Sequence, residues 1–154
     1  MIKIYTDGSS RGNPGPGGYG IIWHKDPYYK ESSQGFVKTT NNRMELLAVI
    51  VALESLKRPG SEVTVYSDSK YVIDAITKGW VYNWQKKGFA GKKNPDLWRR
   101  YLKIHPVHNI KYVWVKGHNN HPQNERCDEL AVNAALSSDL IPDKGYEQAN
   151  SSLL

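Results

Sequence analysis

Four acidic residues stand at the ends of elements that a folded chain can bring together. Asp7 and Asp68 each end a predicted strand, and Glu45 lies in the first turn of the helix predicted between them. Asp128 lies near the start of the last predicted helix. Carboxylates that converge without basic partners repel one another, and a bound cation offsets this repulsion. Oxygen ligands favour Mg²⁺ or Mn²⁺ over Zn²⁺, so the pattern predicts a metal site, although each acid taken alone also fits a helix cap or a surface charge.

The elements that position these acids follow from the spacing of apolar residues. Alternating or continuous apolar residues predict strands over 2–7, 19–24, 30–38, 63–66 and 110–116. Helical spacing, caps and a Pro-Gly stop predict helices over 41–58, 69–77, 80–87, 95–103 and 124–136. Five glycines and two prolines in 8–18 predict a loop. From Ser137 onward the chain turns polar, and we expect this tail, 137–154, to be partly flexible.

The order of these elements predicts an α/β fold in one domain. Short connections join the first three strands, which favours an antiparallel meander. The helix over 41–58 can serve as a crossover that makes the first and fourth strands parallel neighbours. We therefore expect a mixed five-stranded sheet, a three-strand meander plus two parallel strands, with helices on both faces. Asp7 and Asp68 then lie at the carboxyl edge of the sheet, where open α/β sheets bind ligands.

Basic residues are concentrated in one part of the chain. The formal net charge is +6, and between Lys78 and Lys116 there are ten Lys or Arg residues and one acid, Asp96. The rest of the chain has eleven basic and fourteen acidic residues. This uneven distribution of positive charge predicts a polyanionic partner; the alternative is a solvated surface with no partner. The single cysteine, Cys127, excludes an internal disulfide, and with no apolar run of membrane-spanning length we expect a cytoplasmic protein.

The segments around the acids resemble one known family. In order they are YTDGS (5–9), GNPGPGGYG (12–20), TTNNRMEL (39–46), SDSKYV (67–72), WVKGH (114–118) and HPQNERCDELA (121–131). Together they closely resemble the bacterial type 1 ribonucleases H (ribonuclease HI), over about residues 2–136 and with near-family spacing. The resemblance implies a ribonuclease H-like fold and a catalytic domain over 1–136. It also implies hydrolysis of the RNA strand of RNA–DNA hybrids, leaving 5′-phosphate and 3′-hydroxyl ends.

The resemblance also implies roles for the acids. Asp7, Glu45, Asp68 and Asp128 match the four metal-binding carboxylates of the family. Two Mg²⁺ ions, or Mn²⁺, would bind there in the substrate complex, one aiming the attacking water and the other stabilising the leaving oxygen. His118 matches a loop histidine that moves protons or assists product release, the alternative being an exposed loop residue.

Nucleic-acid contacts are implied in the same way. Family members touch the RNA 2′-hydroxyls, the groups that distinguish RNA from DNA. The matching positions here are Asn13, Asn41, Asn42 and the backbone around Gly8 and Ser10. Thr40, with Asn13, matches a grip on a DNA-strand phosphate. Asn41 or Asn42 also fits a helix cap, and Lys70 stands where another member has a glutamine that contacts the nucleic acid.

The segment 80–103 matches a basic protrusion of the family. Its aromatic and basic residues interleave, which suits contact with phosphates and sugars. We expect Trp80 and Trp84 near the groove of the duplex and Trp98 in the core. Lys86 and Lys87 are the predicted phosphate contacts. We expect the chain to act as a monomer.

Other readings of the motifs explain less. Gly15, Gly17 and Gly20 fit a dinucleotide-binding pattern, but strand-forming residues follow where that pattern needs a helix. His121 and Cys127 offer too few soft ligands for zinc. A non-catalytic duplex-binding domain of the same fold explains the basic face but not four acids that oppose binding to a polyanion. A related nuclease acting on DNA shares the acids but has no need of 2′-hydroxyl contacts.

Overall fold

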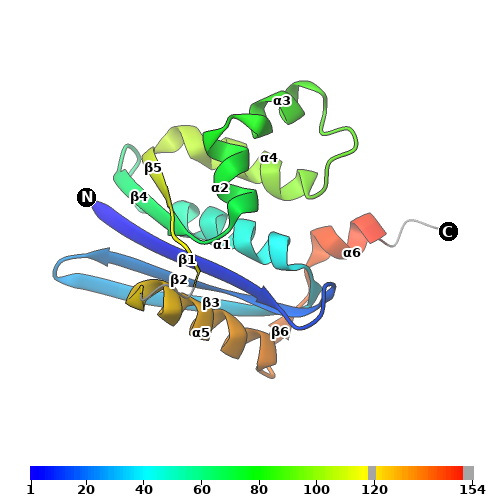
Figure 1. Cartoon of the computed structure of the whole chain (residues 1–154), viewed down its shortest axis with the longest axis horizontal. Helices are drawn as coiled ribbons and strands as arrows, with labels where there is room; N and C mark the ends of the chain where they lie inside the picture. The colour runs from blue at the N-terminus through cyan, green and yellow to red at the C-terminus, as the bar shows by residue number, and fades with distance from the viewer. Residues whose placement is uncertain (118–120, 151–154) are drawn as a thin grey trace.

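A computed structural model of the chain describes residues 1–117 and 121–150. It contains a mixed sheet with the strand order β5-β4-β1-β2-β3-β6 (Figure 1). The strands are β1 (Ile2–Ser10), β2 (Gly15–Lys25), β3 (Tyr28–Thr39), β4 (Glu62–Ser67), β5 (Asn109–Trp114) and β6 (Leu140–Ile141). The meander β1-β2-β3 is antiparallel, and β4 is parallel to both β1 and β5. The predicted fold class is confirmed.

Helices cover both faces of the sheet, as predicted. They are α1 (Asn41–Glu54), α2 (Lys70–Thr77), α3 (Trp80–Lys86), α4 (Pro95–Ile104), α5 (Pro122–Leu136) and α6 (Lys144–Asn150), with a 3₁₀ turn at His105–Val107. The helices α1 to α4 lie on one face and α5 lies on the other (Figure 1). Over the described ranges, no helix is both long and apolar enough to cross a membrane.

The main core lies between the sheet and α1. Ten residues of α1, from Arg43 to Leu53, are buried because the helix packs against β1 and β2 on one side and α4 on the other. Ile4, Ile21 and Val65 from the sheet are fully buried beneath it. The helix ends at Glu54, before the predicted end at residue 58, and the Ser55 hydroxyl donates to the carbonyl oxygen of Val51 there (2.7 Å).

The prediction of a loop over 8–18 was wrong. β1 continues to Ser10 and β2 begins at Gly15, so only 11–14 lie between the strands. The glycines are needed for close packing: a Cβ on Gly8 would lie 2.3 Å from the backbone nitrogen of Glu45. On the other face, a Cβ on Gly20 would lie 2.4 Å from the carbonyl oxygen of Cys127. Glycine inside these strands therefore marks the close approach of a helix backbone.

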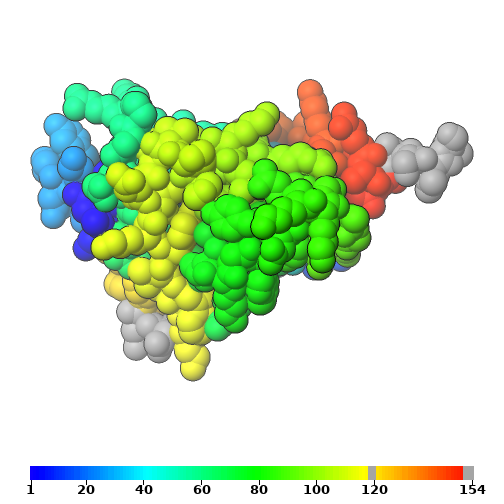
Figure 2. Space-filling model, turned by 90° about the horizontal axis from the view of Figure 1, so that it is seen from above, coloured from blue at the N-terminus to red at the C-terminus, as the bar shows by residue number. Residues whose placement is uncertain are grey.

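The basic protrusion over 80–103 is built by α3, α4 and the turn between them. It covers much of the face shown in Figure 2, in green. As predicted, Trp98 is fully buried, and Trp84 packs edge-on against it with ring centroids 5.9 Å apart. Trp80 is 43% exposed, so the protrusion combines an aromatic core with one exposed indole.

The tail beyond Ser137 contains structure that its polar composition did not predict. β6 pairs with β3 and adds a sixth short strand to the five that were predicted. Asp143 is buried and accepts hydrogen bonds from the Thr39 hydroxyl (2.6 Å) and the Arg43 guanidinium (2.8 Å). Because the partners of this tail are far away in sequence, no local pattern marks it as ordered.

We expect Gly20→Ala to lower the free energy of unfolding by about 1–3 kcal/mol, since the new methyl group displaces α5. Urea denaturation followed by circular dichroism measures this change. Ser33→Ala is the matched control, because exposed Ser33 pairs with Gly20 in the sheet and should change stability by less than about 0.5 kcal/mol. Equal stability of the two variants would contradict the close packing of α5.

Candidate active site

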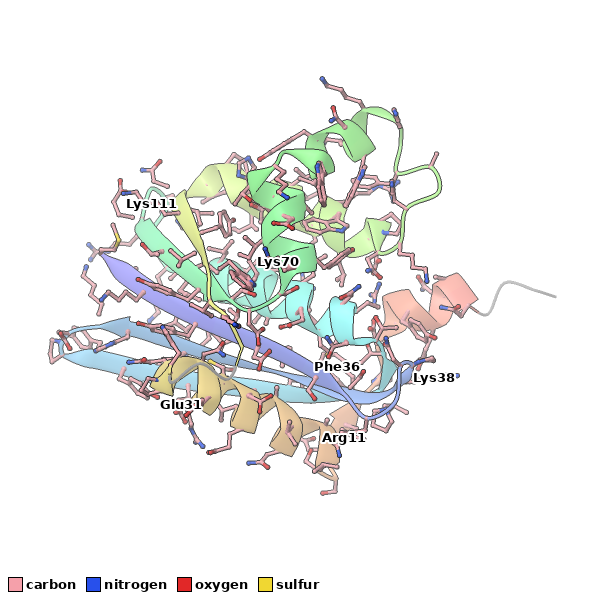
Figure 3. All side chains as sticks on the ribbon, viewed as in Figure 1. Arg11, Glu31, Phe36, Lys38, Lys70 and Lys111 are labelled. Carbon is pink, nitrogen blue, oxygen red and sulfur yellow. The ribbon has the colours of Figure 1, made fainter. Side chains whose placement is uncertain are left out.

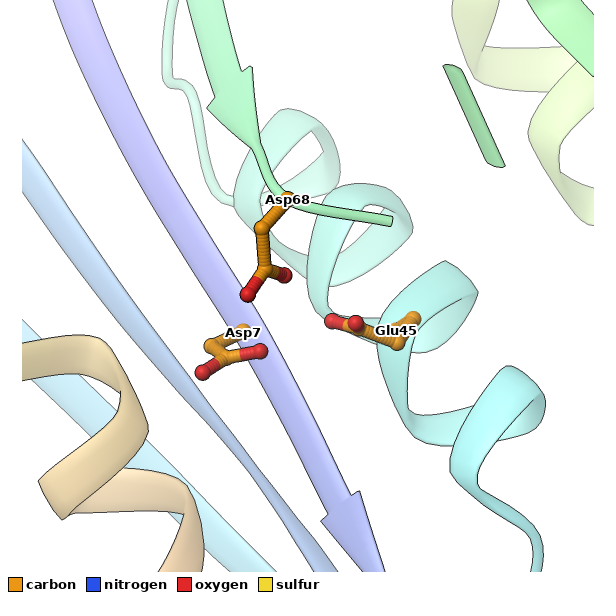
Figure 4. A group of neighbouring side chains, drawn as sticks. All are labelled: Asp7, Glu45 and Asp68. Carbon is orange, nitrogen blue, oxygen red and sulfur yellow. The ribbon is translucent and has the colours of Figure 1, made fainter. Parts of the chain in front are cut away.

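Three of the predicted acids meet at one edge of the sheet. Carboxylate oxygens of Asp7, Glu45 and Asp68 all lie within 4.8 Å of one another. Figure 4 shows them converging from β1, from α1 and from the chain just beyond β4. The parallel pairing of β1 and β4 places Asp7 and Asp68 side by side, as the sequence predicted.

Local contacts hold each acid in place. The backbone N–H of Gly8 donates to Oδ1 of Asp7 (2.9 Å), and the missing side chain of Gly8 lets Glu45 approach. The carbonyl oxygen of Asp68 accepts a hydrogen bond from the indole of Trp114 (3.1 Å). Ser69, the next residue, caps α2 by accepting from the N–H of Val72 (3.2 Å). Asp68 is thus fixed between the end of β4 and the start of α2.

The site is buried and electrostatically strained. Asp7 is 4% exposed and Glu45 is 6% exposed. Burial and then the charge of Asp68 raise the pKa of Asp7 to about 8, although hydrogen bonds with Glu45 and Gly8 act in the opposite direction. Burial, followed by the charges of Asp7 and Asp68, also raises the pKa of Glu45 well above its ordinary value. These are carboxylates packed closely enough to disfavour ionisation of one another.

The donor set fits a divalent cation. Oε1 of Glu45 and Oδ1 of Asp68 are buried and have no hydrogen-bond partner. No salt bridge to Asp7, Glu45 or Asp68 forms within 1–117 and 121–150. Buried carboxylate oxygens without a donor are costly, and coordination of a hard cation satisfies them.

The fourth acid lies close to the cluster but outside it. Asp128 is half-buried in α5, and its charge is one of those that raise the pKa of Asp7. It therefore acts on the same site electrostatically. The predicted proton-transfer residue, His118, lies outside the described residues.

The residues considered for zinc have other contacts. A ring nitrogen of His121 accepts from the N–H of Asn124 (3.4 Å), so this histidine caps α5. The thiol of buried Cys127 donates to the carbonyl oxygen of Tyr5 (3.3 Å). Neither belongs to the cluster of possible metal ligands found in the described part of the chain.

Several predicted nucleic-acid contacts line one groove, although Asp7, Glu45 and Asp68 do not line it. Its volume is about 1040 Å³, and its walls include Asn13, Thr40, Asn42, Trp80 and Trp84. The backbone N–H of Asn41 donates to Oδ1 of Asn13 (3.1 Å), which ties the β1–β2 connection to the start of α1. Thr40 caps α1 through its hydroxyl, so neither asparagine of the pair is the cap.

The remaining predicted contacts do not line this groove. Lys70 begins α2 (Figure 3), and its ammonium lies 4.3 Å from the ring centroid of half-exposed Trp114. Gly8 is buried and Ser10 is half-buried at the end of β1. Lys86 and Lys87 are exposed at the end of α3 but do not line the groove.

Other groove residues were missed by the sequence analysis. Five residues of the tail line it, as do Arg43 and Tyr71. Lys92, Lys93 and Arg99 also line it; they belong to the predicted basic protrusion but were not chosen as contacts. The basic composition of 80–103 was an available signal for the last three. No signal in the sequence indicated the tail.

We expect the metal-free protein to lose stability as the pH rises from about 4 to about 8. Because the pKa of Asp7 is raised, the folded protein keeps a proton that the unfolded chain releases in this range. Asp7→Asn removes the contribution of Asp7 to this pH dependence and should raise the thermal midpoint at pH 8 in chelator by several degrees. Thermal melts at several pH values measure both effects. The exposed control Asp139→Asn should follow the parent, and parallel curves for Asp7→Asn and the parent would contradict the electrostatic strain.

Comparisons with known proteins identify the family. The family model for RNase H matches residues 1–136. Ribonuclease H of Desulforamulus reducens is 54% identical over 144 residues, covering 90% of each chain, and that of Trichodesmium erythraeum is 50% identical over 95% of this chain and 96% of its own. Among solved structures, LC9-RNase H1, described as a type 1 RNase H with the type 2 active-site motif, superposes with a TM-score of 0.79 at 32% identity, over 99% of this chain and 81% of its own. LC11-RNase H1, solved in complex with an RNA/DNA hybrid, gives a TM-score of 0.64 at 32% identity, over 89% of this chain and all of its own. The chain belongs to the RNase H family.

Proposed function

We propose that this protein is an endonuclease that hydrolyses the RNA strand of RNA–DNA hybrids, leaving 5′-phosphate and 3′-hydroxyl ends. The observation that carries the proposal is the cluster of Asp7, Glu45 and Asp68 at the edge of the sheet. The first two acids are buried and Asp68 is half-buried, and none of the three forms a salt bridge within the described part of the chain. Relatives at 50–54% identity over most of the chain are named Ribonuclease H. A further relative was solved with an RNA/DNA hybrid bound, which supports the same substrate here.

The RNase H family is metal-dependent, and the acid cluster would hold the metal. We assign Mg²⁺ to Asp7, Glu45 and Asp68, with Asp128 as the fourth ligand. The substrate complex would hold two ions. Mn²⁺ has the same preference for oxygen ligands. When bound, the metal supplies Lewis-acid stabilisation of charge and a more acidic water.

The residues of the chain bind and orient the duplex. Asn13, Asn41, Asn42 and the backbone at Gly8 and Ser10 would contact the RNA 2′-hydroxyls. The exposed edge of the groove, with Thr40, Trp80 and Trp84, would hold the other strand, with Lys70 near a phosphate. His118 would transfer a proton near the scissile phosphate.

A catalytic domain over 1–136, acting as a monomer in the cytoplasm, completes the proposal. The family match over these residues supports the boundary, and the single thiol suits a reducing compartment. Light scattering after size exclusion tests the oligomeric state.

The deciding experiment is cleavage of one labelled RNA in three contexts. The RNA is presented within an RNA–DNA hybrid, within an RNA–RNA duplex and as a single strand, each with Mg²⁺, Mn²⁺ or chelator. We expect internal cuts in the hybrid alone, with metal present, leaving 3′-hydroxyl ends. Hybrid binding without cleavage in either metal would instead favour a non-catalytic duplex-binding domain.

We expect Asp7→Asn to abolish turnover while the fold is preserved, because the metal loses an anionic ligand. Initial rates on the hybrid measure this effect, and circular dichroism confirms the fold. A turnover rate of Asp7→Asn within about tenfold of the parent rate would contradict the assignment of Asp7 as a metal ligand. Asp139→Asn again serves as the control.

We expect Lys86→Ala with Lys87→Ala to weaken hybrid binding and to flatten its salt dependence by about one to two units in the slope of log K against log salt. Each lysine that neutralises a phosphate releases a counterion on binding. Fluorescence anisotropy titrations over a range of salt concentrations measure the slope. Lys25→Ala with Lys30→Ala, in the strands β2 and β3 away from the protrusion, is the control of equal charge. An unchanged slope would mean that the protrusion does not contact phosphate through these lysines.

A further inference from the structure

The groove lined by Asn13, Thr40 and Asn42 has a wall that lies outside the residues matched by the family model. Residues from three regions line the groove: the β1–β2 connection with the start of α1, the basic protrusion, and the helix α6. From α6 these are Gly145, Tyr146, Gln148, Ala149 and Asn150. The family match ends at residue 136, before this helix. Figure 2 shows the orange-red C-terminal segment directly beside the green protrusion.

A buried ionic cluster fixes this wall to the floor of the groove. Arg43 is 3% exposed, and its guanidinium donates to both oxygens of Asp143 (2.8 and 3.0 Å). The same group donates to both oxygens of Asp96 at the start of α4 (2.9 and 2.7 Å). Oδ1 of Asp143 also accepts from the N–H of Tyr146 (3.2 Å) and so caps α6. One side chain of α1 thus joins the protrusion and the C-terminal helix.

Steric contact provides a second, independent constraint. A Cβ on Gly145 would lie 2.0 Å from Oδ2 of Asp96 and 2.8 Å from Nη2 of Arg43. The backbone of α6 therefore rests directly on the ion pair. Bidentate Arg–carboxylate pairs have well-defined geometry, so the wall has a fixed position relative to α1.

The charge of the wall suits a polyanion. Lys92, Lys93 and Arg99 line the side of the groove formed by the protrusion. The residues of α6 that line it are uncharged, while the acid Glu147 of the same helix does not line it. The negative charge of Asp96 is paired with Arg43. Tyr146 is half-buried there and offers a hydroxyl donor and an aromatic ring.

We propose that α6 forms one wall of the nucleic-acid groove and that Tyr146 positions a backbone of the duplex against the cations of the protrusion. This inference rests on the proposed function, since it takes the hybrid as the ligand. The hydroxyl of Tyr146 donates to a phosphate or sugar oxygen, and its ring packs against the sugar. The role is one of positioning, so it affects the binding of substrate more than the chemical step.

The test compares variants on the two sides of α6. Tyr146→Ala removes the donor and the ring, and Gly145→Val displaces the whole helix from the Arg43–Asp96 pair. Glu147→Gln is the matched control, since Glu147 is exposed on the same helix outside the groove. We expect KM for the hybrid to rise about three- to tenfold in both test variants, with kcat within about twofold of the parent. Glu147→Gln should leave both constants unchanged.

Hybrid affinity measured by anisotropy in chelator at low salt separates this inference from the proposed function. If the parent cleaves nothing but Tyr146→Ala still binds the hybrid more weakly than the parent does, the wall is supported and only the nuclease proposal is overturned. Normal cleavage by the parent with unchanged KM and affinity in Tyr146→Ala would overturn the wall alone. Circular dichroism melts show whether Gly145→Val keeps the fold. If it does not, Tyr146→Ala alone tests the wall, because the side chain of Tyr146 takes no part in the ionic cluster.

Discussion

The close approach of α1 to β1 is the constraint on which the site depends. Gly8 has no side chain, so the backbone of α1 packs where a Cβ on residue 8 would otherwise lie. This close packing brings Glu45 to Asp7. The backbone N–H of Gly8 also donates a hydrogen bond to the Asp7 carboxylate and orients it. A larger residue would push the helix outward and separate the acids, because protein interiors do not yield easily to added atoms. One glycine thus sets both the packing of the core and the geometry of the site.

That packing creates a site that opposes folding in the absence of metal. Burial raises the pKa values of Asp7 and Glu45, and the charges of the neighbouring carboxylates raise them further. Active sites often hold such unfavourable charge, which the remaining structure must offset. Here the apolar packing of α1 between the sheet and α4 provides that support. The residue that ties α1 to the groove, Arg43, has in contrast both of its carboxylate partners within hydrogen-bond distance.

The two charged clusters therefore serve opposite purposes along one helix. In the acid cluster, one carboxylate oxygen of Glu45 and one of Asp68 are buried without a hydrogen-bond partner and are available to a ligand. Two residues before Glu45, Arg43 is saturated by Asp96 and Asp143 and holds the protrusion and the C-terminal helix in place. Complete pairing rigidifies a buried polar group, whereas incomplete pairing leaves it available for binding. Since both side chains belong to α1, the position of the groove and the position of the acids are set together.

The sequence by itself determined the order of the elements, the mixed sheet and the acids Asp7, Glu45 and Asp68, because periodicity and turn residues act locally and parallel pairing follows from the crossover helix. It also indicated that Trp98 belongs to the core. Only the tertiary structure decided the role of Gly8 and Gly18, which read as loop residues but lie against the backbones of α1 and α5. It alone placed β6 and α6, since Asp143 accepts hydrogen bonds from Arg43, one hundred positions away in the chain. Interactions across such separations leave no periodic trace, and a polar tail can be recognised as structured only where its buried partners are visible.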